Sequence, residues 1–321
     1  MKRRDLLIAP PALAALTFAV GARAQIGGAP VRILVGAPAG GSTDTLARSL
    51  AVSMGPALGR NVIVENRPGA GGNIAADAVA KAAPDGNTLL MSFTSHAINA
   101  TLYPSLPFDP VKDFTALTCV ATSPSILVAH PSVAAKDVRE LIALAKAKPG
   151  QLNFAIGAVG SSLHMAGEEF KMQSGVDIVN IPYKGTAPAV QDLLAGQVQL
   201  MFAAVGNVKA HIQAGKLKAL GVTTAKRLPA FPDVPAIAEA LPGYESSAWF
   251  GLFGPARLPA DVARRLGDAA RQALQQPDMR KRLETEGAIP VGNSPEQFAA
   301  FVQSEIPRWA KVVKFSGAKP E

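Results

Sequence analysis

Two short loops rich in glycine and serine are the segments of this sequence best suited to bind a ligand. The loop at 36–44 follows a strand-like run at 31–35. The loop at 157–162 follows a similar run at 152–156. A helical pattern comes next in both cases, so each loop stands at a helix N-terminus, where unpaired N–H groups and the helix dipole favour a carboxylate or phosphate. If the loops face each other across a cleft, they hold one anion together.

Neither glycine-rich region matches a nucleotide-binding pattern. The loop at 36–41 has the glycine separation of a P-loop, but Ser42 stands where that pattern requires lysine. The glycines at 69–72 begin a dinucleotide fingerprint whose last glycine is replaced by Ile74. Without the lysine, the first loop either binds an anion through backbone donors or is a simple strand-to-helix turn. Asp44 then either contacts the ligand or caps the helix.

The sequence offers no arrangement for nucleophilic or metal chemistry. His164 occupies the position where a nucleophile elbow around Ser162 requires glycine. The spacing of two residues also puts these side chains on different faces of a helix. The four histidines form no ligand-spaced cluster, and the single cysteine, Cys119, excludes multi-cysteine metal sites. We therefore expect a protein that holds no metal and no cofactor.

Three further polar segments follow expected strands. The segment 183–186 precedes a helix, so Tyr183 offers a ring face and a hydroxyl while Thr186 caps that helix. We interpret it as a candidate second clamp on the ligand. The segments 92–96 and 203–207 also come directly after strands, on the crevice side of an open α/β sheet.

Strand-like runs alternate with helical patterns along almost the whole chain. The expected strands are 31–35, 61–64, 88–93, 125–129, 152–156, 177–181, 198–203, 217–223 and 249–253. The expected helices are 45–58, 74–83, 135–147, 162–173, 187–195, 207–214, 260–275, 277–286 and 295–313. This alternation predicts βαβ units and a mainly parallel sheet in two α/β domains. The chain crosses between them near 124–130 and 246–254, and a proline ends each crossing, which is typical of a hinge.

Length and composition agree with two globular domains. The chain has 321 residues, of which 48% are hydrophobic and 17% charged, so disorder is excluded. The formal charge is +8, and removing the four basic residues and one acid before residue 25 lowers it to +5. The remaining basic residues are scattered and do not form a stripe, so we expect no nucleic-acid partner.

The first 24 residues have the pattern of a signal peptide. Basic residues at 2–4 precede a short apolar stretch at 6–20, and Ala22 and Ala24 fit the small-residue cleavage rule. The arginine pair resembles a twin-arginine signal, although an ordinary secretory signal fits equally well. We expect export to the periplasm by either route, with cleavage near Ala24.

Several motifs together resemble one known family. They are 31–35, Pro-Ala-Gly-Gly-Ser-Thr-Asp at 38–44, Val-Glu-Asn-Arg-Pro-Gly-Ala-Gly-Gly-Asn at 64–73, Pro-Asp-Gly-Asn-Thr-Leu-Leu at 84–90, Pro-Tyr-Lys-Gly at 182–185 and Gly-Gln-Val at 196–198. This set resembles the Bug family, the extracytoplasmic solute receptors of tripartite tricarboxylate transporters. The resemblance covers essentially the whole mature chain, and the run at 65–72 is its most specific part.

The resemblance implies an α/β protein with the two-domain periplasmic-binding-protein fold, also called the Venus-flytrap fold. Its ligand cleft lies between the domains, which two crossing strands join. On this basis we expect a signal peptide at 1–24, domain 1 at 25–125 and 250–321, and domain 2 at 126–249.

The resemblance also implies which residues hold the ligand, mainly through backbone amides, hydroxyls and water. The expected ligand-binding residues are Ala39, Gly40, Ser42, Thr43, Asp44, Ser161, Ser162, Tyr183 and Thr186. Specificity is expected to depend on loop residues Ser95, His96, Gly160, Ala204 and Gly206.

The function implied is capture of a small organic carboxylate for the integral-membrane permease of a tripartite tricarboxylate transporter. The resemblance implies no catalysis, so we expect a protein that is not an enzyme. We expect the receptor to be a monomer. Two alternatives stay open: a ligand-sensing periplasmic adaptor for a membrane signalling protein, and a serine hydrolase or lyase that uses Ser161 or Ser162. The missing nucleophile elbow counts against the second alternative.

Overall fold

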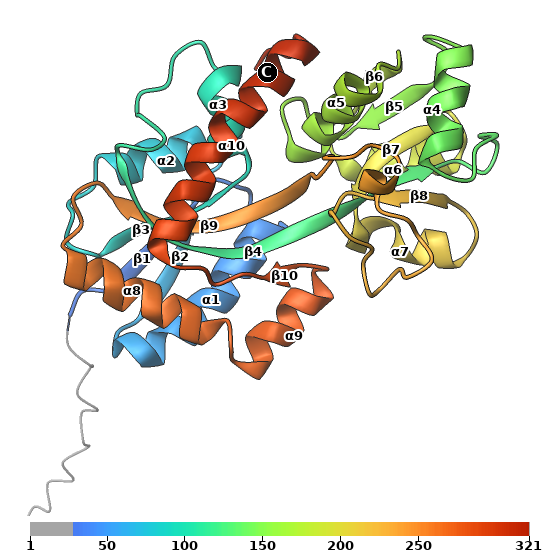
Figure 1. Ribbon diagram of the computed structural model, residues 1–321. Helices are drawn as coiled ribbons and strands as arrows, with labels where there is room; N and C mark the ends of the chain where they lie inside the picture. The colour runs from blue at the N-terminus through green and yellow to red at the C-terminus, as the bar shows by residue number, and fades with distance from the viewer. Residues whose placement is uncertain (1–27, 321) are drawn as a thin grey trace, which may run out of the picture.

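The structure is a computed structural model and describes residues 28–320. The expected signal peptide at 1–24 and the cleavage site near Ala24 lie outside the described residues. The described part forms two α/β domains joined by long strands, which confirms the expected fold class (Figure 1). None of its helices combines the length and the apolar character needed to cross a membrane.

Domain 1 has helices on both faces of its sheet. Its strands are β1 (Val31–Val35), β2 (Val62–Asn66), β3 (Thr88–Phe93), β9 (Ser247–Pro255), β10 (Ile289–Pro290) and the first part of β4 (Phe114–Ala129). Its helices are α1 (Ser42–Leu58), η1 (Ala70–Gly72), α2 (Asn73–Ala80), α3 (Ser95–Leu102), α8 (Ala260–Ala273), α9 (Pro277–Thr285) and α10 (Pro295–Ser316). Val31, Ile33 and Val35 are fully buried on the face covered by α1, α8 and α9. Leu34 is buried on the opposite face, against α2, α3 and α10. Strands buried on both faces are mostly apolar, and β1 is apolar except at Arg32, which is half-exposed.

Domain 2 repeats this layered arrangement on a smaller sheet. Its strands are the end of β4, β5 (Asn153–Ile156), β6 (Val179–Pro182), β7 (Leu200–Ala204) and β8 (Lys218–Val222). Its helices are α4 (Val138–Ala147), α5 (Ser162–Ser174), α6 (Thr186–Leu194), α7 (Val205–Gln213) and η2 (Ile237–Glu239). Phe154 of β5 packs on Phe170 of α5, while the next residue, Ala155, packs on the opposite face with α6 and α7. Alternation along one strand therefore supplies two hydrophobic cores.

The long strand β4 joins the two domains. Residues 114–124 pair with β9 in the sheet of domain 1, and residues 125–129 pair with β7 and β8 in the sheet of domain 2. The chain returns at Ser247, which pairs with Pro124 as β9 begins. We refer below to 28–124 and 247–320 as domain 1 and to 125–246 as domain 2.

The structure differs from the sequence-based expectation in strand direction and in several elements, among them β10, η1 and η2, which were not expected. The sheet is mixed and not mainly parallel, because β9 and β4 run antiparallel to each other and to their neighbours β3, β7 and β8. A chain that leaves a domain along one strand and returns along the next must reverse direction. The strand expected at 125–129 also begins 11 residues earlier, at Phe114, and α3 was not expected.

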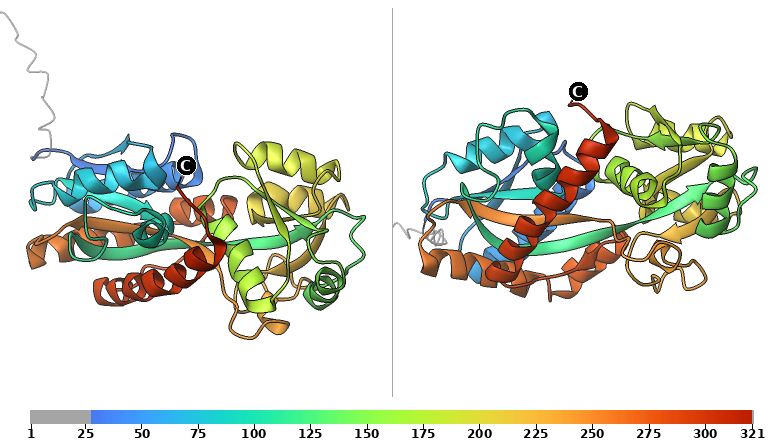
Figure 2. Two further views of the ribbon diagram at one scale, coloured as in Figure 1. Left: turned by 90° about the horizontal axis from the view of Figure 1, so that it is seen from above. Right: turned by 45° about the horizontal axis from the view of Figure 1, so that its top comes forward.

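The domains also touch away from the crossing strands, where α10 of domain 1 passes α5 of domain 2 (Figure 2). Met165 of α5 lies in the hydrophobic cluster formed by α2, α3 and α10. Beside it, Arg308 of α10 forms an ion pair with Glu169 of α5 at 2.9 Å. This contact places the N-terminal half of α5 against domain 1.

Candidate functional site

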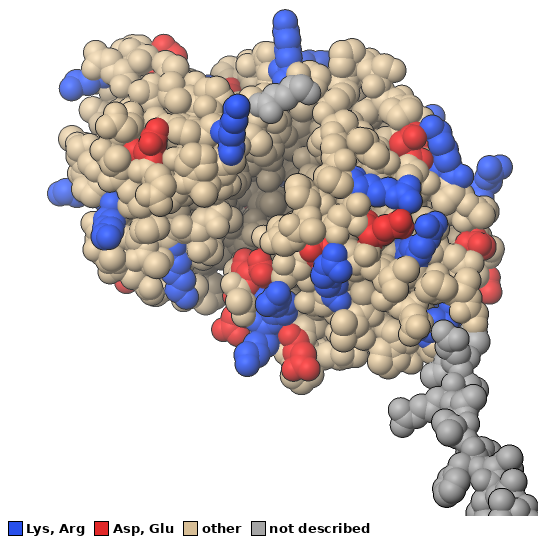
Figure 3. Space-filling model, turned by 180° about the vertical axis from the view of Figure 1, so that it is seen from behind, with Lys and Arg blue, Asp and Glu red and all other residues tan. Residues whose placement is uncertain are grey.

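A cleft of about 340 Å³ lies between the two domains, beside both crossing strands. The space-filling view shows the molecule hollowed between its two lobes (Figure 3). Domain 1 contributes Ser42, Ser123, Pro124, Ala248, Phe250, Thr285 and Glu286 to the lining. Domain 2 contributes Ser162, Leu163, Ala204, Gly206 and Asn207. A ligand in this cleft would touch both domains and both crossings.

The first glycine loop brings the N-terminus of α1 to the cleft. Ser42 is the first residue of α1 and lines the cleft, while Ala39 and Gly40 are exposed just before it. Thr43 and Asp44 are buried on the inner side of the same turn. The first expected ligand loop therefore lies at one rim of the cleft, with some of its residues exposed and others buried.

Asp44 holds this loop in shape. Its Oδ2 accepts hydrogen bonds from the backbone N–H of Gly40 at 2.9 Å and from Nε of Arg48 at 3.0 Å. Its Oδ1 accepts one from Nδ2 of Asn66, also at 2.9 Å. Burial alone would raise the pKa of this carboxyl, but these donors outweigh it and hold the pKa below its ordinary value. Asp44 is thus an ionised scaffold whose oxygens are already hydrogen bonded.

The second glycine loop brings the N-terminus of α5 to the same cleft. Ser161 is the N-cap, and its Oγ accepts the backbone N–H of His164 at 3.2 Å. Ser162 and Leu163, the first two residues of α5, line the cleft. Their backbone N–H groups have no acceptor within the helix, as at every helix N-terminus. Gly160 is buried, and a Cβ there would lie 2.4 Å from a methyl carbon of Leu102 in domain 1, so this loop sits close against α3.

A third helix N-terminus completes the domain 2 side. Ala204 ends β7, and Gly206 and Asn207 lie in the first turn of α7; all three line the cleft. Gly287 of domain 1 approaches this turn, since a Cβ on it would lie 3.5 Å from Cβ of Val205. The two domains therefore nearly meet at this end of the cleft.

Tyr183 and Thr186 lie beside the second loop and are not among the residues that line the cleft. The backbone N–H of Gly185 donates to the carbonyl of Gly157 at 2.9 Å, which ties the two loops together. The Tyr183 hydroxyl donates to Oδ2 of Asp192 at 2.8 Å. Burial and this carboxylate raise the pKa of Tyr183 to about 12. The hydroxyl expected to clamp the ligand is therefore used within domain 2.

Ser95 and His96 are buried at the start of α3 and also do not line the cleft. The His96 ring lies 5.0 Å from the ring of Phe253 and 4.9 Å from that of Phe114, and its Nε2 donates to the carbonyl of Pro110 at 2.8 Å. Burial lowers the pKa of His96 to about 4, despite an opposite effect of the Pro110 carbonyl. At neutral pH this is an uncharged core residue of domain 1.

Four expected residues thus come together in the cleft: Ser42, Ser162, Ala204 and Gly206. Asn207 belongs to the segment 203–207 that the sequence placed on the crevice side, and the lining residues that were not expected are Ser123, Pro124, Leu163, Ala248, Phe250, Thr285 and Glu286. The two crossings expected at 124–130 and 246–254 could have indicated Pro124, Ala248 and Phe250. No local signal marked Thr285 and Glu286, which lie at the C-terminal end of α9 and reach the cleft only through the tertiary packing.

The charge of the cleft comes from backbone dipoles and one acid. Its described lining contains no lysine, arginine or histidine, and its one charged side chain is Glu286, which is 23% exposed and lies 4.0 Å from Arg282. The N-termini of α1, α5 and α7 supply N–H donors and positive helix ends. Within residues 28–320, no three side chains of the metal-binding types are grouped to hold a metal ion. The arrangement suits a small anion held by hydrogen bonds.

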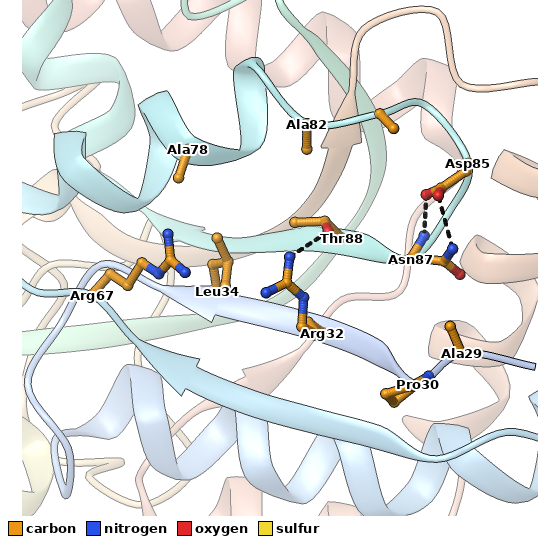
Figure 4. A pocket seen from close by; sticks show the side chains of 11 residues that line it. Ala29, Pro30, Arg32, Leu34, Arg67, Ala78, Ala82, Asp85, Asn87 and Thr88 are labelled. Carbon is orange, nitrogen blue, oxygen red and sulfur yellow. Dashed lines mark hydrogen bonds between the residues drawn. The ribbon is translucent and has the colours of Figure 1, made fainter.

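A second hollow, of about 450 Å³, lies on the α2 side of the domain 1 sheet (Figure 4). The guanidinium groups of Arg32 and Arg67 lie on either side of Leu34 there. Each is also paired with a carboxylate oxygen of Glu65, at 3.4 and 3.2 Å respectively. Only domain 1 lines this hollow, whereas both domains line the interdomain cleft.

Comparison with known proteins gives consistent matches over most of the chain. Residues 46–317 match the family described as the tripartite tricarboxylate transporter family receptor. The protein BugT of Bordetella pertussis is 40% identical over 293 residues, covering 90% of each chain. Rpa4515 of R. palustris, solved with adipate, is 37% identical with a TM-score of 0.77, covering 91% of this chain and 98% of the other. MatC from Rhodopseudomonas palustris, solved with bound malate, is 37% identical with a TM-score of 0.74, covering 88% and 98%.

Proposed function

We propose a function from the premise that this chain belongs to the tripartite tricarboxylate transporter receptor family. The protein captures a small organic carboxylate in the periplasm and delivers it to the membrane permease of its transporter. One observation carries this proposal: the N-termini of α1 and α5, from different domains, open onto a single cleft. Adipate and malate, the ligands of two related structures, are both carboxylates of suitable size.

The ligand carboxylate is held by hydroxyls and backbone N–H groups and not by ion pairs. Ser42 and Ser162 approach it from opposite sides, with Ala204 and Gly206 at the third helix N-terminus. Such charge-assisted hydrogen bonds are about twice as strong as neutral ones. Phe250 on β9 offers an apolar wall for the carbon skeleton of the acid. The other expected residues of the two loops support these contacts from behind.

Ligand binding favours closure of the two domains about the crossing strands. A ligand shifts the balance between open and closed states only as far as its contacts differ between them. An acid that touches both α1 and α5 makes its full set of contacts only when the domains approach. The permease then has a surface by which to distinguish the loaded receptor from the empty one.

The direct test is a thermal-shift screen of residues 25–321 against dicarboxylates, tricarboxylates, acidic amino acids and aromatic acids. An acid present at 100 times its dissociation constant adds about 2.7 kcal/mol to the stability. A clear shift with one class of acid supports the proposal, provided that the matched neutral amides give none. Protein that has been unfolded, stripped of bound ligand and refolded, and still responds to no acid, would contradict it.

Export is tested separately. The proposal places the mature chain in the periplasm, with a signal peptide removed near Ala24. N-terminal sequencing of the protein recovered by osmotic shock should begin within a few residues of Gln25. A full-length chain that stays with the cytoplasmic fraction would contradict this location. Replacing the arginine pair at 3–4 by lysines should block export only if the twin-arginine route is used.

A further inference from the structure

The loop that begins α5 is anchored to a buried side chain beneath it. The backbone N–H of Gly160 donates to Nδ1 of His164 at 3.0 Å. His164 is only 4% exposed, and its own backbone N–H donates to Oγ of Ser161. One residue therefore holds this loop at two points, once through its backbone and once through its ring.

The hydrogen bond from Gly160 determines which ring nitrogen of His164 carries the proton. A backbone N–H is always a donor, so Nδ1 must accept and carries no proton. The proton of the neutral ring is then on Nε2, which lies 3.6 Å from Oε1 of Glu168. The same carboxylate oxygen accepts from Nζ of Lys171 and from Nδ2 of Asn180, both at 2.6 Å.

This polar cluster lies inside domain 2, where Nδ2 of Asn180 also lies 3.3 Å from Nε2 of His164. Glu168 is 2% exposed. Burial raises the pKa of Glu168, but its hydrogen bonds to His164, Asn180 and Lys171 lower it further, below its ordinary value. A buried carboxylate of this kind is rigid, because moving any partner leaves a charge unpaired. The imidazole is thus fixed in orientation from below and presents one acceptor to the loop above.

The first loop of domain 1 has the same construction. Gly40 donates its N–H to Asp44, as Gly160 does to His164, and in both cases the acceptor lies four residues later, in the first turn of the helix. Both glycines have a left-handed backbone, with φ of +83° and +73°. Two loops built alike, in two domains, at one cleft, indicate a shared task.

We propose that His164 is a positioning residue for the ligand: its Nδ1 draws the Gly160 N–H inward and so leaves the N–H groups of Ser162 and Leu163 directed at the cleft. This inference rests on the proposed function for the identity of the ligand only. The anchoring itself involves only atoms of the protein. His164 does not line the cleft, so it acts through the loop and makes no contact with the acid.

The test distinguishes the effect of the hydrogen-bond acceptor at Nδ1 of His164 from the effect of the packing of its ring. His164→Asn keeps an acceptor, because Oδ1 of asparagine is attached to Cγ as Nδ1 of histidine is. His164→Leu fills similar space and accepts nothing. His130→Leu is the matched control, since His130 bonds to Ser132 in another loop of domain 2. The two readouts are hydrogen exchange of the Gly160 amide in the empty protein and the dissociation constant of the acid found in the screen.

In His164→Leu we expect Gly160 exchange to become about tenfold faster or more, and acid binding to weaken by about tenfold or more. His164→Asn should restore both to within about threefold of wild type, as expected when the acceptor is retained. Equal losses in the leucine and asparagine variants, with both still folded by circular dichroism, would overturn the proposal, because the ring would then act by packing alone. Unchanged exchange in His164→Leu would overturn it as well. If wild type binds no acid, the proposed function fails, and Gly160 exchange still decides whether His164 anchors the loop.

Discussion

At the scale of single residues, the polar side chains near the cleft either contact its interior or hold its loops. Ser42 and Ser162 belong to the first group, and Asp44 and His164 to the second. Sequence motifs indicated Ser42, Ser162 and Asp44 without separating the two groups and did not indicate His164, because a motif records which residues occur together and not which way their side chains point. His96 is an example, since its place after β3 suggested a cleft residue and its ring lies in the core.

Burial of His96 predicts a pH-dependent stability. Its pKa is lowered from 6.5 to about 4 in the folded protein, so the unfolded chain binds the proton more readily between these values. Stability contributed by the neutral ring is therefore full above pH 6.5 and is lost as the pH falls towards 4, by about 3 kcal/mol. Urea unfolding at pH 7 and pH 5 should show a smaller difference for His96→Gln than for wild type. An equal difference would contradict the assignment, and acid binding at pH 7 should be unchanged.

The negative charge of Glu286 leads us to expect that the cleft disfavours acids with a second carboxylate near this side chain. It is the one charged side chain among the described lining residues, so a second carboxylate near it would be repelled. Glu286→Gln should improve binding of a dicarboxylate, relative to the monocarboxylate of equal chain length, by about tenfold. Glu284→Gln, on the exposed side of α9, is the matched control and should change neither affinity. Titration calorimetry with both acids measures this, and an unchanged ratio would place Glu286 away from the ligand.

At the scale of elements, the sequence predicts those whose signals are local. The buried run of β1 and the capped start of α10, where Ser294 accepts the backbone N–H of Gln297, are readable from neighbouring residues. The first part of β4 cannot be predicted from neighbouring residues, because its partner strand β9 lies more than 120 residues further along the chain. Thr285 and Glu286 reach the cleft for the same reason: only tertiary packing brings α9 beside it. The antiparallel direction of β4 and β9 at the centre of the sheet likewise depends on which strands pair, which local sequence does not show.

The first loop packs so closely against η1 that we expect position 36 to tolerate no side chain larger than that of glycine. A Cβ on Gly36 would lie 2.6 Å from Cα of Gly72, a backbone atom that cannot turn aside. Gly36→Ala should therefore lower the free energy of unfolding by about 1 to 3 kcal/mol. Gly206→Ala is the control, because a Cβ there meets nothing within 4 Å. Urea melts of both variants measure the difference, and a Gly36→Ala protein as stable as wild type would show that the two loops can separate freely.

At the scale of the whole molecule, α10 connects the domains outside the crossing strands. Arg308 pairs with Glu305 of its own helix at 2.8 Å and with Glu169 of domain 2 at 2.9 Å, and it also donates to the carbonyl of Glu245. Glu305 in turn accepts the indole N–H of Trp249 at 3.0 Å, on the crossing strand β9. The crossing strand β9 and the contact between α10 and α5 are therefore linked by one network of hydrogen bonds and ion pairs. A relative motion of the domains would have to preserve or break these bonds.

This network predicts an energetic coupling between the domains. Arg308→Met removes the guanidinium partner of the buried carboxylates of Glu169 and Glu305 and should lower the free energy of unfolding by about 3 kcal/mol. Adding Glu169→Gln should recover at least about 1 kcal/mol of that loss, because the uncompensated charge is removed. Urea unfolding of the two single variants and the double variant completes the cycle. Strictly additive effects would mean that the ion pair does not couple the domains.

The central claim is that a carboxylate is recognised between the two domains, and isothermal titration calorimetry tests it most directly. Residues 25–321 are titrated with the tightest acid from the screen and, separately, with its neutral primary amide. The account predicts one acid bound per chain and an amide that binds about a hundredfold more weakly, because the helix N-termini favour a negative charge. An amide that binds as tightly as the acid, or an acid bound with equal affinity when both Ser42 and Ser162 are replaced by alanine, would contradict it.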